Sequence, residues 1–138
     1  MRPDTITILI VDSDLGFVFW LGHTLDSAGY FSLPAKSIPD AVELLRLLNR
    51  DIDLLIVNCS LFGAADLIGS LRRAQPTLKV LAACDPGDSA KDVSGVDFIE
   101  EKPLAPDDEA ARRWMDSVRR TLGTDTPASN VGSSGMLS

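Results

Sequence analysis

The chain has 138 residues, of which 45% are hydrophobic, and this size fits one compact domain with a modest tail. Thirteen basic and 20 acidic side chains give a net charge of −7, which argues against direct nucleic-acid binding, because such surfaces place Lys and Arg against phosphates. No signal-peptide core follows Met1, and no stretch approaches the roughly 18 apolar residues of a membrane span. We therefore expect a cytoplasmic protein without membrane contact.

Short apolar runs alternate with longer segments of helical periodicity, the pattern of a parallel sheet covered on both faces. Gly29 is suited to end a first helix, and Pro39 to the first turn of a second. In chain order, we predict strand 5–11, helix 14–28, strand 31–35, helix 39–49, strand 53–57, helix 65–74, strand 78–83, helix 88–93, strand 96–99 and helix 106–122. The predicted fold is a doubly wound α/β sandwich.

The composition changes after residue 122. Residues 123–138 are rich in Gly, Ser and Thr and have no helical or strand periodicity. We expect residues 1–122 to form the domain and residues 123–138 to be a disordered tail, or the stump of a linker to a removed output domain.

Polar residues stand where the predicted strands end. Asp12, Ser13 and Asp14 follow the first strand, Asn58 ends the third, and Lys102 follows the fifth. Because the carboxyl ends of parallel strands meet at one edge of the sheet, we expect these groups to converge there, where open α/β sheets bind their ligands.

Three segments together resemble a response-regulator receiver domain of the CheY-like superfamily: 8–14, 53–58 and 98–103. The resemblance covers roughly residues 5–122 and implies a flavodoxin-like sheet of order 2-1-3-4-5. Receiver domains hold Mg²⁺ with acidic residues after the first strand and accept phosphate from a histidine kinase on an aspartate after the third. A Ser or Thr after the fourth strand and a Lys before a Pro then bind the phosphoryl oxygens.

At the phosphoacceptor position the chain has Asn58. A carboxamide is not a nucleophile of the carboxylate type, so no acyl phosphate is expected there. The paired acids after the first strand would be Asp12 and Ser13, while Asp14 is better placed to begin the first helix. Because Mg²⁺ prefers carboxylate oxygens, we expect weak magnesium binding at Asp12 at most, no other metal site and no cofactor.

Two further positions of the receiver pattern can be compared. Ala82 would take the place of the switching hydroxyl residue, whereas Lys102 and Pro103 are retained. Without phosphate and metal, Lys102 is expected to pair with Asp12 and to hydrogen-bond the carbonyl oxygen of Asn58. The resemblance therefore implies a degenerate pseudo-receiver.

Phe19 and Trp20 point partly away from the apolar stripe of the first predicted helix. Trp20 either packs beside Trp114 of the last helix or joins Phe19 in a docking surface. Cys59 and Cys84 end neighbouring strands, so they are either small buried hydrophobic residues or an oxidant-sensing pair.

We expect a protein without enzymatic activity that acts in phosphorelay-type signalling through phosphorylation-independent binding to a histidine kinase, another regulator or itself. One alternative is a receiver phosphorylated on Asp12 or Asp14. Another is a flavodoxin-like domain that binds a small molecule, which the absence of a glycine-rich phosphate loop disfavours.

Overall fold

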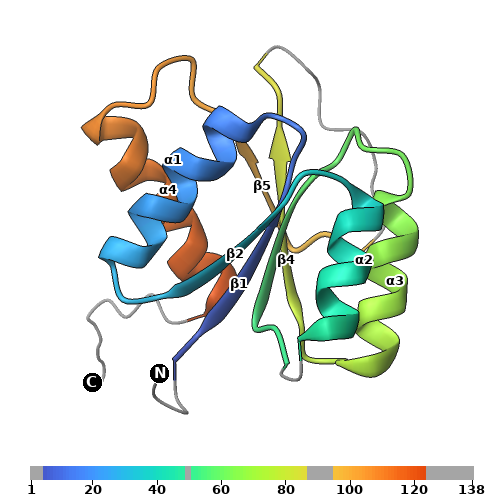
Figure 1. Cartoon of the computed structure of the whole chain (residues 1–138). Coiled ribbons are helices and arrows are strands. Elements are labelled where there is room, and N and C mark those ends of the chain that lie inside the picture. Colours follow the sequence, from blue (N-terminus) through green and yellow to red (C-terminus); the bar gives the residue numbers. More distant parts are fainter. Residues whose placement is uncertain (1–4, 49–50, 87–94, 124–138) are drawn as a thin grey trace, which may run out of the picture.

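The computed structural model describes residues 5–48, 51–86 and 95–123. In this part of the chain, strands and helices alternate (Figure 1): β1 Thr7–Val11, α1 Leu15–Ser27, β2 Phe31–Ala35, α2 Ile38–Leu47, β3 Leu54–Asn58, α3 Ala64–Ala74, β4 Lys79–Cys84, β5 Phe98–Glu101 and α4 Asp108–Leu122. The helix predicted at 88–93 and the tail beyond Gly123 lie outside the described residues. Within the described segments, no helix has the length and apolar character that a membrane crossing requires.

The strands form one sheet in the order β2-β1-β3-β4-β5, and every neighbouring pair is parallel. Ile8 of β1 pairs with Leu54 of β3, and Asn58 at the end of β3 pairs with Ala83 of β4. The predicted α/β class and strand order are confirmed. Since all strands run the same way, their carboxyl ends lie along one edge, which we call the carboxyl edge.

Helices cover both faces of the sheet, with α1 and α4 on one side and α2 and α3 on the other (Figure 1). Strand side chains alternate between the two faces. Ile8 and Ile10 of β1 pack in the cluster with α1 and α4, whereas Leu9 and Val11 pack in the cluster with α2 and α3. All five residues of β1 are buried, as expected for a central strand covered on both sides.

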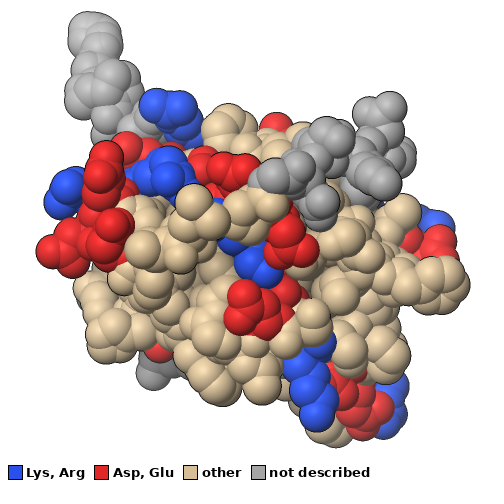
Figure 2. Space-filling view, turned by 90° about the horizontal axis from the view of Figure 1, so that it is seen from above, with Lys and Arg blue, Asp and Glu red and all other residues tan. Residues whose placement is uncertain are grey.

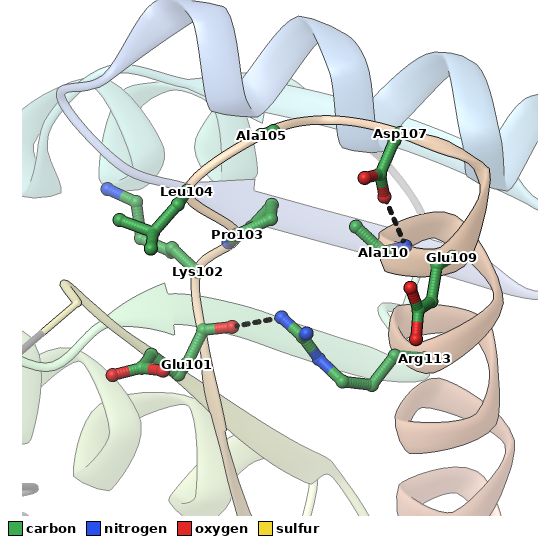
Figure 3. Close-up of a pocket in the computed structure, with 9 residues that line it drawn as sticks. All are labelled: Glu101, Lys102, Pro103, Leu104, Ala105, Asp107, Glu109, Ala110 and Arg113. Carbon is green, nitrogen blue, oxygen red and sulfur yellow. Dashed lines mark hydrogen bonds between the residues drawn. The ribbon is translucent and has the colours of Figure 1, made fainter.

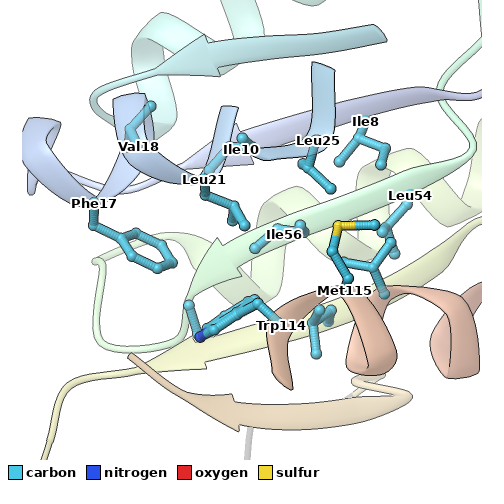
Figure 4. Packing of buried hydrophobic residues seen from close by; sticks show 13 residues of the cluster. Ile8, Ile10, Phe17, Val18, Leu21, Leu25, Leu54, Ile56, Trp114 and Met115 are labelled. Carbon is cyan, nitrogen blue, oxygen red and sulfur yellow. The ribbon is translucent and has the colours of Figure 1, made fainter. Parts of the chain in front are cut away.

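An aromatic group lies in the layer between α1, α4 and the sheet (Figure 4). The rings of Phe17 and Trp114 meet edge to face with centroids 5.3 Å apart, and the Trp114 side chain is fully buried. Trp20 is half-buried against the same cluster, and its ring centroid lies 6.2 Å from that of Phe17. The tertiary contacts therefore favour the packing role for Trp20 and leave Phe19, which is 63% exposed, as the outward aromatic residue of α1.

Local signals set the helix ends. Three side chains cap the starts of α1, α2 and α4: those of Asp14, Ser37 and Asp107. Each accepts a hydrogen bond from the backbone N–H of the residue three positions later in the chain. Gly29 has a φ of +95°, a left-handed conformation that favours glycine, and it follows the end of α1 as predicted. These caps fix where each helix begins, and therefore which residues remain in the loops of the carboxyl edge.

Candidate functional site

Five polar residues gather at the carboxyl edge: Asp12, Asp14, Asn58, Asp85 and Lys102. We call them the Lys102 cluster. Asp12 follows β1, Asn58 ends β3, Asp85 follows β4 and Lys102 follows β5. Figure 2 views the molecule from this edge and shows acidic and basic groups side by side near its centre. The predicted convergence of Asp12, Asn58 and Lys102 is therefore observed.

Asp12 is the most buried acid of the cluster, with 1% of its surface exposed. One carboxylate oxygen, Oδ1, accepts the backbone N–H of Asp14 at 2.9 Å. The other, Oδ2, lies 3.0 Å from Lys102 Nζ and accepts a hydrogen bond from Asn58 Nδ2 at 3.2 Å. A buried carboxylate needs such partners, and both oxygens of Asp12 have them within the protein.

Asn58 is buried, and its amide is held in one orientation by a neighbour that donates to its oxygen and a neighbour that accepts from its nitrogen. Its Oδ1 accepts the backbone N–H of Ser60 at 2.9 Å and the Ser60 hydroxyl at 2.6 Å. Its Nδ2 faces the Asp12 carboxylate, which can only accept. The expected hydrogen bond from Lys102 to the Asn58 carbonyl oxygen was wrong, because Ser60 takes that oxygen.

The Lys102 ammonium lies among three carboxylates. Its Nζ is 2.8 Å from Asp85 Oδ1, 3.0 Å from Asp12 Oδ2 and 3.6 Å from Asp14 Oδ2. The predicted pairing with Asp12 is confirmed. Burial by itself would lower the pKa of Lys102, but the hydrogen bonds and negative charges of Asp85 and Asp12 outweigh it and raise that pKa above 10.5. Lys102 is therefore a permanent cation at neutral pH.

Asp85 is a further member of the cluster that was not predicted from the sequence. The residue directly follows β4, and its carboxylate makes the shortest contact of Lys102 in the cluster. An acidic residue at the carboxyl end of a central strand was the signal available in the sequence. Since the strand was predicted to end at residue 83, Asp85 was not expected to be the first residue after it.

Ala82, the expected equivalent of the switching hydroxyl residue, lies near the end of β4. This residue lies inside β4, between Val57 of β3 and Ile99 of β5, and β4 continues to Cys84. The strand was predicted to end at residue 83, and the parallel pairing with β5 extends it to Cys84. The strand-end residue that borders the Lys102 cluster is Cys84.

Ser13 and Asp14 are both exposed. Asp14 Oδ1 accepts the Phe17 backbone N–H at 3.2 Å, so Asp14 begins α1 as predicted. Its second oxygen remains near Lys102 at 3.6 Å. Of the acidic loop, only Asp12 is part of the buried site.

The residues present do not fit a magnesium site. Both Asp12 oxygens and the Asn58 oxygen already accept hydrogen bonds from the protein, and the Lys102 ammonium lies 3.0 Å from the Asp12 carboxylate. A cation in that place would lie against an ammonium group and would have to displace these donors. Among the described residues, no group of three or more His, Cys, Asp and Glu side chains is arranged to hold a metal ion.

A pocket adjoins the cluster between the end of β5 and the start of α4, where Pro103 lies (Figure 3). Arg113 of α4 donates a hydrogen bond to the Glu101 carbonyl oxygen at 3.0 Å. In this view, the Lys102 side chain points away from Arg113. Leu104, which is 91% exposed, is the outward residue of this loop. The pocket therefore borders the cluster through Lys102, which lines it together with residues of the loop and of α4.

No protein-family model matches the sequence, and no curated protein matches it. Solved structures do match. A response-regulator receiver protein from Sinorhizobium medicae has a TM-score of 0.71 at 19% identity and covers 88% of this chain and 98% of its own. A putative response regulator from Chloroflexus aurantiacus has a TM-score of 0.69 at 25% identity, and the match covers 87% of this chain and 99% of its own.

A CheY-like receiver domain protein from Methanospirillum hungatei has a TM-score of 0.69 at 20% identity and covers 87% of this chain and 95% of its own. The sheet order, the helices on both faces and these matches agree. The chain has the CheY-like fold of response-regulator receiver domains.

Proposed function

We propose that this protein is a degenerate receiver module of two-component-type signal transduction, and that it acts by binding other proteins without being phosphorylated. The observation that supports this most directly is the inward amide of Asn58, which donates to Asp12 at 3.2 Å. An amide nitrogen is not the nucleophile that phosphoryl transfer to an acyl phosphate needs. No enzymatic activity follows from such a site.

The charges of the cluster support the same proposal. Lys102 already has two carboxylates within 3.0 Å, those of Asp12 and Asp85. Asp85 supplies a built-in anion to an ammonium that would otherwise be free to bind a phosphoryl group. The positive charge of Lys102 is thus already compensated by carboxylates of the cluster, and these contacts hold the loops of the carboxyl edge in one arrangement.

The partner we propose is a histidine kinase, another regulator or a second copy of the chain. Phe19 on α1 and Leu104 after β5 are exposed by 63% and 91%, on segments that border the cluster. Exposed large apolar side chains are suitable interface anchors. The cytoplasmic location and the lack of contact with nucleic acid and membrane remain predictions from the sequence.

Treatment with acetyl phosphate and magnesium tests the chemistry, with an ordinary receiver domain treated in parallel as a positive control. We expect the intact mass of this protein to stay unchanged while the control gains a phosphoryl group. A stoichiometric adduct that hydroxylamine removes would contradict the proposal. Peptide mapping would then show whether Asp12 or Asp14 is modified, which is the alternative hypothesis of a receiver phosphorylated on another carboxylate. Asp14 is the more accessible of the two, because it is exposed and lies 3.6 Å from Lys102.

The binding role can be tested with two surface variants. Phe19→Ala changes the α1 face, and Leu47→Ala, at a residue that is 72% exposed on α2, changes the opposite side of the sheet. Both variants should fold normally. We expect the wild type and the Leu47 variant to bind a kinase or regulator from the same cell equally, and the Phe19 variant to bind at least fivefold more weakly. Equal binding by all three proteins would remove α1 from the proposed interface.

A further inference from the structure

The two cysteines of the chain lie side by side at the carboxyl edge. Cys59 Sγ is 3.2 Å from Cys84 Sγ, which is a close contact between two unbonded thiols. Cys59 follows the last residue of β3, and Cys84 is the last residue of β4. Two residues that are 25 positions apart in the sequence thus form a single dithiol.

The backbone already holds the two residues at a spacing that suits a covalent bond. Asn58 pairs with Ala83, and Cys59 N donates to the Ala83 oxygen at 3.3 Å, so the ladder between β3 and β4 continues to the cysteines. Neighbouring strands lie about 4.8 Å apart, which is within the roughly 4.4–6.8 Å that disulfides span between Cα atoms. The sulfur atoms need to approach by only about 1.2 Å to reach bonding distance.

We propose that Cys59 and Cys84 form a reversible intramolecular disulfide, and that this dithiol is an oxidation site for peroxides or small-molecule disulfides. The proposal does not depend on whether the domain signals without phosphate. Disulfides in reducing compartments are typically transient and regulatory, which suits a pair that is reduced at rest.

Exposure sets the order of the reaction. Cys59 is partly exposed, whereas Cys84 is buried with 4% of its surface accessible. The Cys59 thiolate attacks a peroxide oxygen, the O–O bond breaks, and an alcohol or water leaves after protonation, which gives a sulfenic acid. The Cys84 sulfur then attacks the Cys59 sulfur. The sulfenic oxygen leaves as water with the thiol proton, and the peroxide has been reduced by two electrons.

The position of the pair connects this chemistry to the Lys102 cluster. Cys59 follows Asn58, whose amide donates a hydrogen bond to Asp12. Cys84 precedes Asp85, whose carboxylate forms a salt bridge with Lys102. A disulfide would therefore tie the segment after β3 to the segment after β4 on the border of the cluster. We expect it to slow amide exchange at Cys59 and Ser60 at least tenfold.

Mass spectrometry of the intact protein tests the proposal. The wild type is treated with equimolar hydrogen peroxide or with glutathione disulfide, then alkylated with iodoacetamide without reduction. We expect loss of two hydrogen atoms, no alkylation and a monomer on a non-reducing gel, all reversed by dithiothreitol. Alkylation of both thiols after oxidant treatment, or disulfide only between chains, would overturn the proposal. Because the chain has two cysteines, these outcomes cannot be confused.

Two variants and one unfolded control separate the roles. In Cys84→Ser, Cys59 should be trapped by a sulfenic-acid reagent or remain joined to glutathione, whereas in Cys59→Ser the buried Cys84 should react at least tenfold more slowly. Wild-type protein in urea should form the disulfide at least tenfold more slowly than the folded protein. Equal rates in the folded and unfolded chain would show that the fold does not position the pair, and would refute the inference without any variant.

Discussion

Lys102 Nζ lies 2.8 Å from Asp85 Oδ1, although the two residues follow different strands of the sheet. This contact joins the segment after β4 to the segment after β5. Asp12, which follows β1, contacts the same ammonium group, with its Oδ2 3.0 Å from Lys102 Nζ. The three strand ends are thus held by one ammonium group with 6% of its side chain exposed.

Lys102→Met should destabilise the protein strongly. The substitution leaves the Asp12 carboxylate buried without its cation, and removing one partner of a buried pair costs about 3–5 kcal/mol. Urea unfolding followed by circular dichroism measures this change. Lys79→Met is the matched control, because Lys79 is an exposed lysine at the start of β4 and its loss should cost less than about 0.5 kcal/mol. Similar losses for the two variants would contradict a structural role for Lys102.

Asp12→Ala and Asp85→Ala should differ although both acids contact Lys102. Asp12 is 1% exposed, and its removal leaves the Asn58 amide and the Asp14 N–H without an acceptor, at a cost of at least about 2 kcal/mol. The Asp85 side chain is 45% exposed, so water can replace it and the cost should stay below about 1 kcal/mol. The same unfolding measurement ranks them, and the reverse order would show that Asp85 is the main partner of Lys102.

Asn58→Asp should destabilise the protein in the absence of divalent cations. The new carboxylate would face the Asp12 carboxylate across the present 3.2 Å contact, and the hydrogen bond to Asp12 would be lost, for a cost of about 2 kcal/mol. Magnesium should restore part of this stability, because two facing carboxylates bind it. Thermal unfolding with EDTA and with magnesium measures the effect. The wild type should show no such shift, and a magnesium shift of equal size in both proteins would count against our account of the cluster.

Stability should fall at high pH through Lys102. Because its pKa in the folded protein is raised above the ordinary 10.5, the folded state retains a proton that the unfolded chain releases. The contribution of Lys102 to the free energy of unfolding is complete below pH 10.5. It is lost as the pH rises through the pKa of Lys102 in the folded protein, and above that pKa the stability no longer changes through this group. Urea unfolding between pH 9 and 12 for the wild type and for Lys102→Met isolates this group, since other titrating groups are common to both proteins. Parallel pH profiles would contradict the assignment.

Phe17→Ala and Phe19→Ala separate the core from the surface of α1. Phe17 is 7% exposed and packs edge to face on Trp114, so its truncation should cost about 3–5 kcal/mol. Phe19 is 63% exposed, and its truncation should stay within about 0.5 kcal/mol. Denaturant unfolding checks both values. A large loss for Phe19→Ala would mean that the residue is structural, and it could no longer serve as a binding probe.

Much of the architecture follows from local patterns. The central strands are continuous apolar runs, and their alternate residues, such as Ile8 and Leu9, face opposite layers, as a strand periodicity of two requires. Helix starts at Asp14 and Ser37 follow from capping chemistry, which acts over three or four residues and is therefore visible in the sequence. The convergence of Asp12, Asn58 and Lys102 could be predicted because parallel strands end at one edge.

The hydrogen bonds within the cluster could not be predicted in the same way. β4 ends at Cys84, one residue beyond the predicted end, so that Asp85 directly follows the strand and contacts Lys102. Such boundaries depend on the pairing with β5. The orientation of the Asn58 amide depends on Ser60, whose hydroxyl and N–H meet the oxygen first. The choice between a core and a surface role for Trp20 depends on its packing against Phe17 and the cluster under α1 and α4, which only the tertiary structure shows.

The sequence by itself determined which groups are available: an amide after an apolar run, a lysine before a proline, and two thiols in the chain. The order of apolar runs was also enough to predict a parallel sheet covered on both faces, because burial of strands and helices is set by their periodicity, whereas the strand order was implied by the resemblance to receiver domains. Only the tertiary structure decided which groups touch. Contacts of about 3 Å between Lys102, Asp85 and Asp12, and between Cys59 and Cys84, depend on strand ends that are distant in the chain and are aligned only when the sheet forms.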